Sequence, residues 1–336
     1  MTRLSLAGLL ALAALPGGAA AQSFTVPGDA VAVYNLVGEA TVTAASGGSV
    51  TVQVTPVGRD GNQIKPETAD IRGRKALVIR YPDDDLVYRA MGRGSSSSFQ
   101  IREDGTWGGG YSGDDDDDRG WRGHGHKVRV RGDGDGLEAA ANLRIAVPAG
   151  KRVAVFVGVG RIDVTNVDGE LLLDTSSGDV TTRGTKGTLR IDTGSGDVDV
   201  TGSSGSLLDI DTGSGTVEIS EVTADELRVD TGSGDIIANS VSTGRIEFDT
   251  GSGEVKATLR SSPSHLAIDT GSGDVTLRLP EGVDATVDLD TGSGDFNVDF
   301  PMQLVHKDDG NLRGRLGKGT GRISVETGSG DISLLK

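Results

Sequence analysis

Acidic residues recur at two fixed positions of a six-residue string in the C-terminal half of the chain. The string reads Asp-Thr-Gly-Ser-Gly-Asp or a close variant of it. Its first residue is Asp174, Asp192, Asp211, Asp230, Asp249, Asp269, Asp290 or Glu326. Its sixth residue is Asp179, Asp197, Asp235, Glu254, Asp274, Asp295 or Asp331, with Thr216 as the exception. Carboxylates of this kind could transfer protons, attack a substrate or bind cations.

The repetition argues against two kinds of hydrolase. Asp-Thr-Gly-Ser is the active-site string of pepsin-like aspartic proteases, whose chemistry needs two carboxylates that share one proton. Here the string recurs along the chain as part of a building unit. Pairs of acids at the separation that glycosidases use arise from any such series, so they are weak evidence for glycoside hydrolysis.

If the strings stack, like charges lie side by side, and something must offset their repulsion. Two unit charges about 5 Å apart repel by roughly 0.8 kcal/mol in water. One solution is that the aspartate oxygens accept backbone N–H bonds from the Gly-Ser-Gly turn. The other is that calcium ions bridge adjacent repeats through oxygen ligands. The candidate calcium ligands are Asp192, Asp197, Asp211, Asp230, Asp235, Asp249, Asp269 and Asp274.

The spacing of the strings predicts the elements that carry them. Successive strings begin 18 to 21 residues apart, and the last interval of 36 residues equals two repeats of 18. A period near 19 indicates one supersecondary unit stacked on copies of itself. Apolar residues alternate with polar ones on both sides of each Gly-rich turn, which predicts two short half-buried strands per coil. The fold class is therefore all-β, a single-chain parallel β-solenoid with about 19 residues per coil.

The stacking makes two further predictions about side chains. Leu189, Leu208 and Leu227 should form one inward column, because they occupy the same place in successive repeats. The outward residues one position further along read Arg190, Asp209, Arg228 and Glu247. Alternating signs of charge would stabilise a stacked ladder by a few tenths of a kcal/mol per pair.

Four segments are expected along the chain. Residues 1–21 resemble a secretory signal peptide, with a positive start, a short apolar run and small residues at the end. Residues 22–90 are expected to form N-terminal coils of the solenoid, and residues 137–336 the regular repeats. Residues 91–136 are rich in Gly, Ser and Asp and predict a flexible, disordered insertion. This segment holds both tryptophans, Trp107 and Trp121.

Composition limits the partners. The chain has no cysteine, so disulfides cannot stabilise it. Its net charge of −16 disfavours nucleic acid and anionic lipid. No apolar stretch that could anchor the chain in a membrane follows the signal peptide. We therefore expect an exported protein in the periplasm, on the cell surface or secreted, whose partner is a protein or glycan of the cell envelope.

The repeat resembles that of a bacterial β-strand-repeat family of unknown function that carries the name "putative adhesin". The resemblance depends on the unit Leu-x-Ile-Asp-Thr-Gly-Ser-Gly-Asp-Val, on the segments 143–148 and 277–280, and on the closing segment 321–332. It implies a β-solenoid of the cell envelope and supplies no catalytic residues. The interpretation is an exported, non-enzymatic, adhesin-like interaction module. The alternative is a carbohydrate-active β-helix enzyme, either a polysaccharide lyase or a hydrolase.

Overall fold

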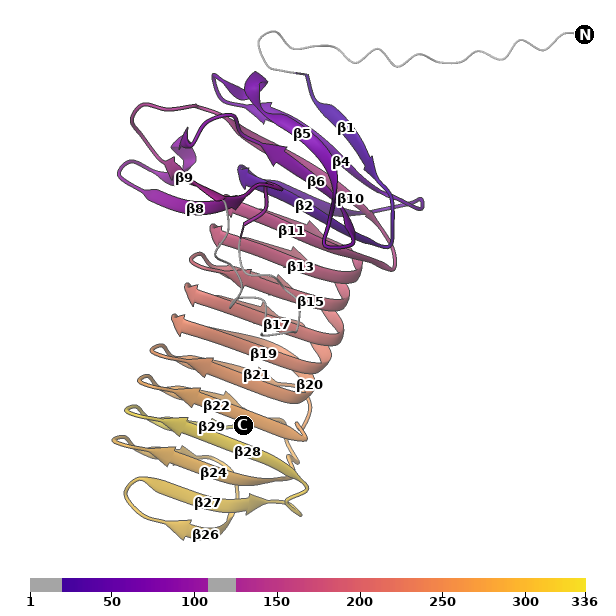
Figure 1. The fold of residues 1–336 in the computed structure, drawn as a ribbon. Coiled ribbons are helices and arrows are strands. Elements are labelled where there is room, and N and C mark those ends of the chain that lie inside the picture. The colour runs from indigo at the N-terminus through magenta and orange to yellow at the C-terminus, as the bar shows by residue number, and fades with distance from the viewer. Residues whose placement is uncertain (1–19, 108–124) are drawn as a thin grey trace, which may run out of the picture.

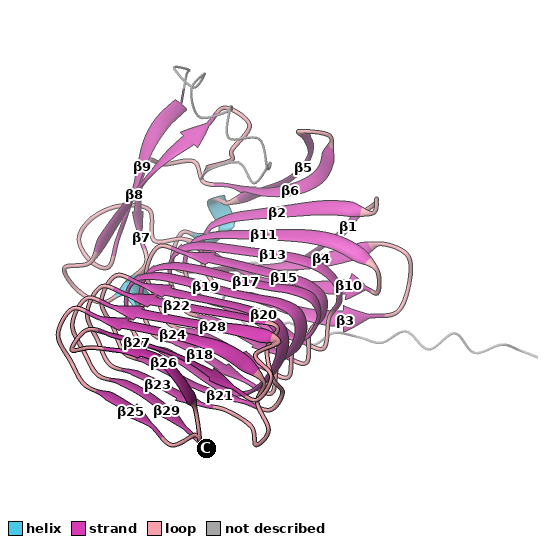
Figure 2. Ribbon diagram, turned by 90° about the horizontal axis from the view of Figure 1, so that it is seen from below, coloured by secondary structure: helices cyan, strands magenta, loops and turns pink. Residues whose placement is uncertain are grey.

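Two long sheets face each other along the repeats and enclose a continuous apolar core (Figures 1 and 2). The computed structural model describes residues 20–107 and 125–336. Within these residues the regular secondary structure is β-strand, apart from two short 3-10 helices, Gly61–Gln63 and Arg89–Met91. The predicted all-β, solenoid-like fold is confirmed.

Sheet B carries the strand that precedes each Gly-rich turn. Its strands in spatial order are β5 (Lys65–Ile71), β6 (Arg74–Arg80), β2 (Ala30–Val37), β11 (Lys151–Val159), β13 (Asp168–Ser177), β15 (Lys186–Thr193), β17 (Ser204–Ser214), β19 (Thr223–Ser233), β20 (Ile236–Thr250), β22 (His265–Thr270), β28 (Gly321–Thr327), β24 (Ala285–Thr291), β27 (Asn311–Leu316) and β26 (Gln303–Lys307).

Sheet A carries the strand that follows each turn. Its strands in spatial order are β1 (Gln22–Val26), β4 (Val50–Val57), β10 (Ala140–Pro148), β3 (Ala40–Ala45), β12 (Ile162–Thr165), β14 (Val180–Arg183), β16 (Val198–Thr201), β18 (Val217–Ser220), the first part of β20, β21 (Val255–Leu259), β23 (Val275–Arg278), β29 (Ile332–Leu335) and β25 (Phe296–Val298).

The register of the parallel pairs places equivalent residues of successive repeats side by side. Leu189 pairs with Leu208, and Leu208 pairs with Leu227, so the predicted inward column is confirmed. These leucines are at most 2% exposed. Because strand residues alternate between faces, the residues between them point outward on sheet B. The core therefore consists of repeated rows of Leu, Ile and Val.

Glycine is required at two places of each turn for different reasons. Gly215 has a φ of +143°, which residues with a side chain rarely adopt. Gly213 has an ordinary φ, but a Cβ on it would lie 2.6 Å from the carbonyl oxygen of Gly194 in the preceding coil. The two glycines of the string thus allow a tight corner and a close approach between coils.

The C-terminal end of the stack does not follow chain order, and this corrects the interpretation of the 36-residue interval. The final coil, β28 and β29, lies between the coil of β22 and β23 and the coil of β24 and β25. Between β25 and β28 the chain forms β26 and β27, which pair antiparallel with each other, and β27 also pairs antiparallel with β24 (Figure 1). The interval therefore contains a closing hairpin in place of a second stacked repeat.

The N-terminal end also departs from a simple stack. Strands β2 and β3 form a coil that continues the parallel register of β11 and β12. Beyond this coil, β6 pairs parallel with β2, and β10 pairs parallel with β3. Strands β1, β4, β5 and β6 add antiparallel pairings at this end. Antiparallel pairs therefore occur at both ends of the stack, here and at β26 and β27, whereas the middle of the stack is parallel.

The expectation of a disordered insertion is wrong for the described part of residues 91–136. There β8 (Ser96–Arg102) and β9 (Gly125–Arg131) pair with each other, and β9 pairs with β7 (Asp85–Val87) to form a small sheet C. Phe99 and Trp107 are 6% and 5% exposed, so burial of aromatic surface holds this unit on the solenoid. Trp121 and the aspartate run 114–118 lie outside the described residues.

Candidate functional site

The outer face of sheet B presents three parallel rows of side chains. We call them row zero, which begins each Asp-Thr-Gly-Ser string, and rows −2 and −4, which lie two and four residues earlier. Within each row, side chains of adjacent strands are neighbours about 4.8 Å apart. Strand alternation fixes these rows on the side of the sheet that faces away from the core.

Row zero is a continuous line of acids from β13 to β24. Asp174, Asp192, Asp211, Asp230, Asp249, Asp269, Glu326 and Asp290 are register neighbours in that spatial order. Burial raises the pKa of Asp174 to about 7, and the neighbouring Asp192 charge adds to the effect. The pKa values of Asp192, Asp211, Asp230 and Asp269 are also raised, chiefly by desolvation. The line therefore favours proton uptake or a positively charged neighbour.

Rows −2 and −4 carry both signs of charge. Arg190, Asp209, Arg228 and Glu247 are successive register partners, as the sequence predicted. Arg190 lies 3.6 Å from Asp209, and Arg228 lies 3.5 Å from Glu247. In row −4, Arg245 contacts Glu247 at 2.6 Å. These exposed pairs each contribute little to stability, but they give the face a mixed charge pattern.

The sixth acid of the string caps the neighbouring coil. An Asp197 carboxylate oxygen accepts the Thr216 N–H at 2.9 Å, and an Asp235 oxygen accepts the Glu254 N–H at 2.8 Å. Asp179, Asp274 and Asp331 accept the equivalent backbone N–H bond from the coil next to their own. These aspartates do accept backbone N–H bonds, as the sequence predicted. The donors belong to the neighbouring coil and not to the Gly-Ser-Gly turn.

The predicted calcium ligands fall into two separate sets. Five of them lie in row zero on sheet B: Asp192, Asp211, Asp230, Asp249 and Asp269. The other three, Asp197, Asp235 and Asp274, are capping residues beyond the turn. Within residues 20–107 and 125–336, no group of three or more His, Asp or Glu is arranged to hold a metal ion. Calcium binding stays a prediction.

The sequence interpretation missed the N-terminal part of this face. In row zero, Asp174 is followed by Phe156 and then Tyr34, whose rings stack at 4.4 Å. Trp107 of the inserted unit packs edge-on against Tyr34 at 5.7 Å, so sheet C covers this aromatic end. Extending the repeat register upstream from Asp174 would have placed Phe156 in row zero. No repeat signal points to Tyr34 or to its contact with Trp107.

No described segment forms a helix with the length and apolar character needed to cross a bilayer. The acids of row zero recur in coil after coil as part of the repeat. Chemically, the outer face of sheet B is a long, regular and charged surface.

Comparisons with known proteins concern the fold more than the function. No curated protein matches the sequence. A solved structure from Bacteroides fragilis, described as "a putative adhesin", shares 13% identity at a TM-score of 0.46, covering 94% of this chain and 96% of its own. One from Clostridium sporogenes, described as "a putative cell adhesion protein", shares 10% identity at a TM-score of 0.21, covering 94% and 98%.

The family comparison is specific to the repeats. Residues 137–335, which contain every Asp-Thr-Gly-Ser string and the strands β26 and β27, match a family model. This match confirms the resemblance noted from the sequence. The chain belongs to the family described as Toastrack DUF4097.

Proposed function

We propose that this protein is an exported, non-enzymatic interaction module of the cell envelope, built on a parallel β-solenoid with about 19 residues per coil. The observation that supports it best is the outer face of sheet B, where the acids of row zero run from β13 to β24 and charged side chains of row −2 lie beside them from β15 to β20. A surface of regularly spaced charges suits a partner that is itself extended or repetitive. Repeat proteins commonly bind through such long surfaces.

Export is part of the proposal and rests on residues 1–21. A short apolar run after Arg3, followed by small residues, is typical of a cleaved signal peptide. Mass spectrometry of the mature protein from its native host, with cell fractionation, tests this step. A mature N-terminus near Gln22 in the periplasmic, surface or secreted fraction is expected. An intact Met1 in the cytoplasm would contradict export.

Binding is tested by co-sedimentation of the purified protein with isolated cell envelopes at increasing salt. We expect binding that weakens with ionic strength, because exposed charges are screened. Arg228→Gln with Arg245→Gln, on the outer face of sheet B, should weaken it. Arg183→Gln, an exposed arginine of sheet A, is the matched control and should not. No sedimentation above that of an unrelated protein would refute an envelope-binding role.

A further inference from the structure

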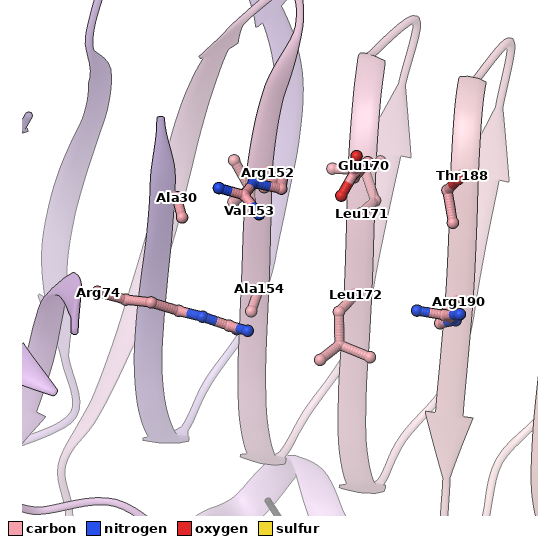
Figure 3. Close-up of a pocket in the computed structure, with 10 residues that line it drawn as sticks. All are labelled: Ala30, Arg74, Arg152, Val153, Ala154, Glu170, Leu171, Leu172, Thr188 and Arg190. Atoms are coloured by element: carbon pink, nitrogen blue, oxygen red, sulfur yellow. The ribbon is translucent and has the colours of Figure 1, made fainter. Parts of the chain in front are cut away.

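The outer face of sheet B changes character between β11 and β15. Row −2 is apolar there, with Ala32, Ala154 and Leu172 as successive register partners, and becomes charged at Arg190. A shallow pocket of about 130 Å³ lies at this boundary. Figure 3 shows Ala154 and Leu172 between the side chains of Arg74 and Arg190, with Arg152 and Glu170 to one side.

Two of the three arginines are available to a ligand. Among the described residues, the side chains of Arg74 and Arg152 form no hydrogen bond or ion pair, and both are exposed. Arg190 already lies 3.6 Å from Asp209. In a chain with a net charge of −16, two guanidinium groups that form no ion pair and lie beside an apolar floor are unusual. A guanidinium presents a planar fork of N–H donors that matches a carboxylate or sulfate group.

The surroundings restrict the ligand to one with few negative charges. Glu170 lines the pocket itself, and the acids of row zero begin two residues beyond Leu172, at Asp174. These carboxylates would repel a polyanion such as nucleic acid. They could instead accept hydrogen bonds from hydroxyl groups, as could the Thr188 hydroxyl in the same pocket. The pocket is also smaller than the roughly 300–1,000 Å³ typical of drug-sized ligands.

We propose that this pocket binds one acidic sugar unit of a glycan. Its carboxylate or sulfate group accepts hydrogen bonds from Arg74 and Arg152, and its ring lies over Ala154 and Leu172. Its hydroxyl groups bond to Glu170 and Thr188. The inference rests on the proposed function, because it names the class of partner that the outer face of sheet B would recognise.

The test is an NMR titration of the full mature chain with small sugars. The probes are the methyl glycoside of glucuronic acid, a sulfated glucose, and the methyl glycoside of glucose as the neutral control. We expect at least one acidic sugar to shift the resonances of Ala154 and Leu172, and the neutral sugar to bind about tenfold more weakly or not at all, since a charge-assisted hydrogen bond contributes more than 1 kcal/mol. The two acidic probes distinguish carboxylate from sulfate.

Matched variants decide whether the pocket is responsible. Arg74→Gln with Arg152→Gln should weaken the acidic sugar about tenfold or more, whereas Arg322→Gln should leave it unchanged. Arg322 is an exposed arginine of row −4 far along the same face. All three side chains are exposed, so the variants should fold, and thermal melts check this.

Equal binding of acidic and neutral sugars, or of the double variant and the native protein, would overturn the pocket assignment. If envelopes still co-sediment with the double variant as with the native protein, the proposed function stands and this inference falls. If the pocket binds acidic sugars but the protein does not bind envelopes, the pocket assignment stands and the envelope-binding function falls.

Discussion

Replacing Gly215 by alanine tests whether the glycines of the string hold the coils together. Gly215 has a φ of +143°, and a Cβ on it would overlap the carbonyl oxygen of Gly196 in the preceding coil. A side chain in such a Gly-only region costs about 1–3 kcal/mol. The overlap costs roughly a further 1–3 kcal/mol, because the overlapped oxygen belongs to the backbone, which the hydrogen bonds between coils hold in place. The lower entropy of unfolded alanine returns only about 0.5–1 kcal/mol.

We therefore expect Gly215→Ala to lower the free energy of unfolding of the surrounding coils by about 3 kcal/mol. Gly244→Ala is the matched control. Gly244 lies in β20 and has no unusual φ, and a Cβ on it would have no neighbour closer than 3.6 Å. That variant should be neutral or slightly stabilising.

The readout must be local as well as global. In a solenoid each coil contacts only its neighbours, so a weakened coil can open without unfolding of the whole chain. Hydrogen exchange of amides in β17 and β19 should speed up by about a hundredfold in Gly215→Ala, and urea unfolding should begin earlier. If Gly215→Ala and Gly244→Ala are equally stable by both measurements, the close packing of glycine corners is not what fixes the stack.

Three further predictions follow from the rows. Ile210→Asp places a charge at a side chain that is 1% exposed and should abolish cooperative folding, whereas Asp209→Asn on the outer face should change the melting temperature little; similar losses would contradict the register. Because folding raises the pKa of Asp174 to about 7, the folded state holds a proton that the unfolded state releases near pH 4, so stability should fall as pH rises from about 4 to about 7 and then level off. Asp174→Asn should flatten that part of the urea-unfolding profile and be more stable than the native protein at pH 8, and an unchanged profile would argue against the buried carboxyl. Millimolar calcium should raise the melting temperature more than sodium chloride of equal ionic strength, and Asp211→Asn with Asp230→Asn should remove the difference; equal effects of the two salts would exclude bridging by calcium.

The sequence alone was sufficient for the repeated part of the fold. Alternating apolar residues around a glycine turn, repeated at a nearly fixed interval, determine both the strands and their faces, because each coil buries the same side chains against its neighbour. For that reason the column of Leu189, Leu208 and Leu227 and the alternating row from Arg190 to Glu247 were correctly predicted. The repeat also predicted that the acids would line up in regular rows, but it did not predict which backbone N–H groups the acids would cap.

Only the tertiary structure decided how the stack ends and what lies beside it. An interval of 36 residues is compatible with two stacked coils, yet β26 and β27 close the stack and the last coil returns between earlier ones. The order of coils is set by contacts between distant segments, and identical repeats leave it undetermined in the sequence. The same holds for the pocket. Arg74 lies on a strand far earlier in the chain than Arg152 and Leu172, and only the pairing of β6, β2, β11 and β13 brings the three together.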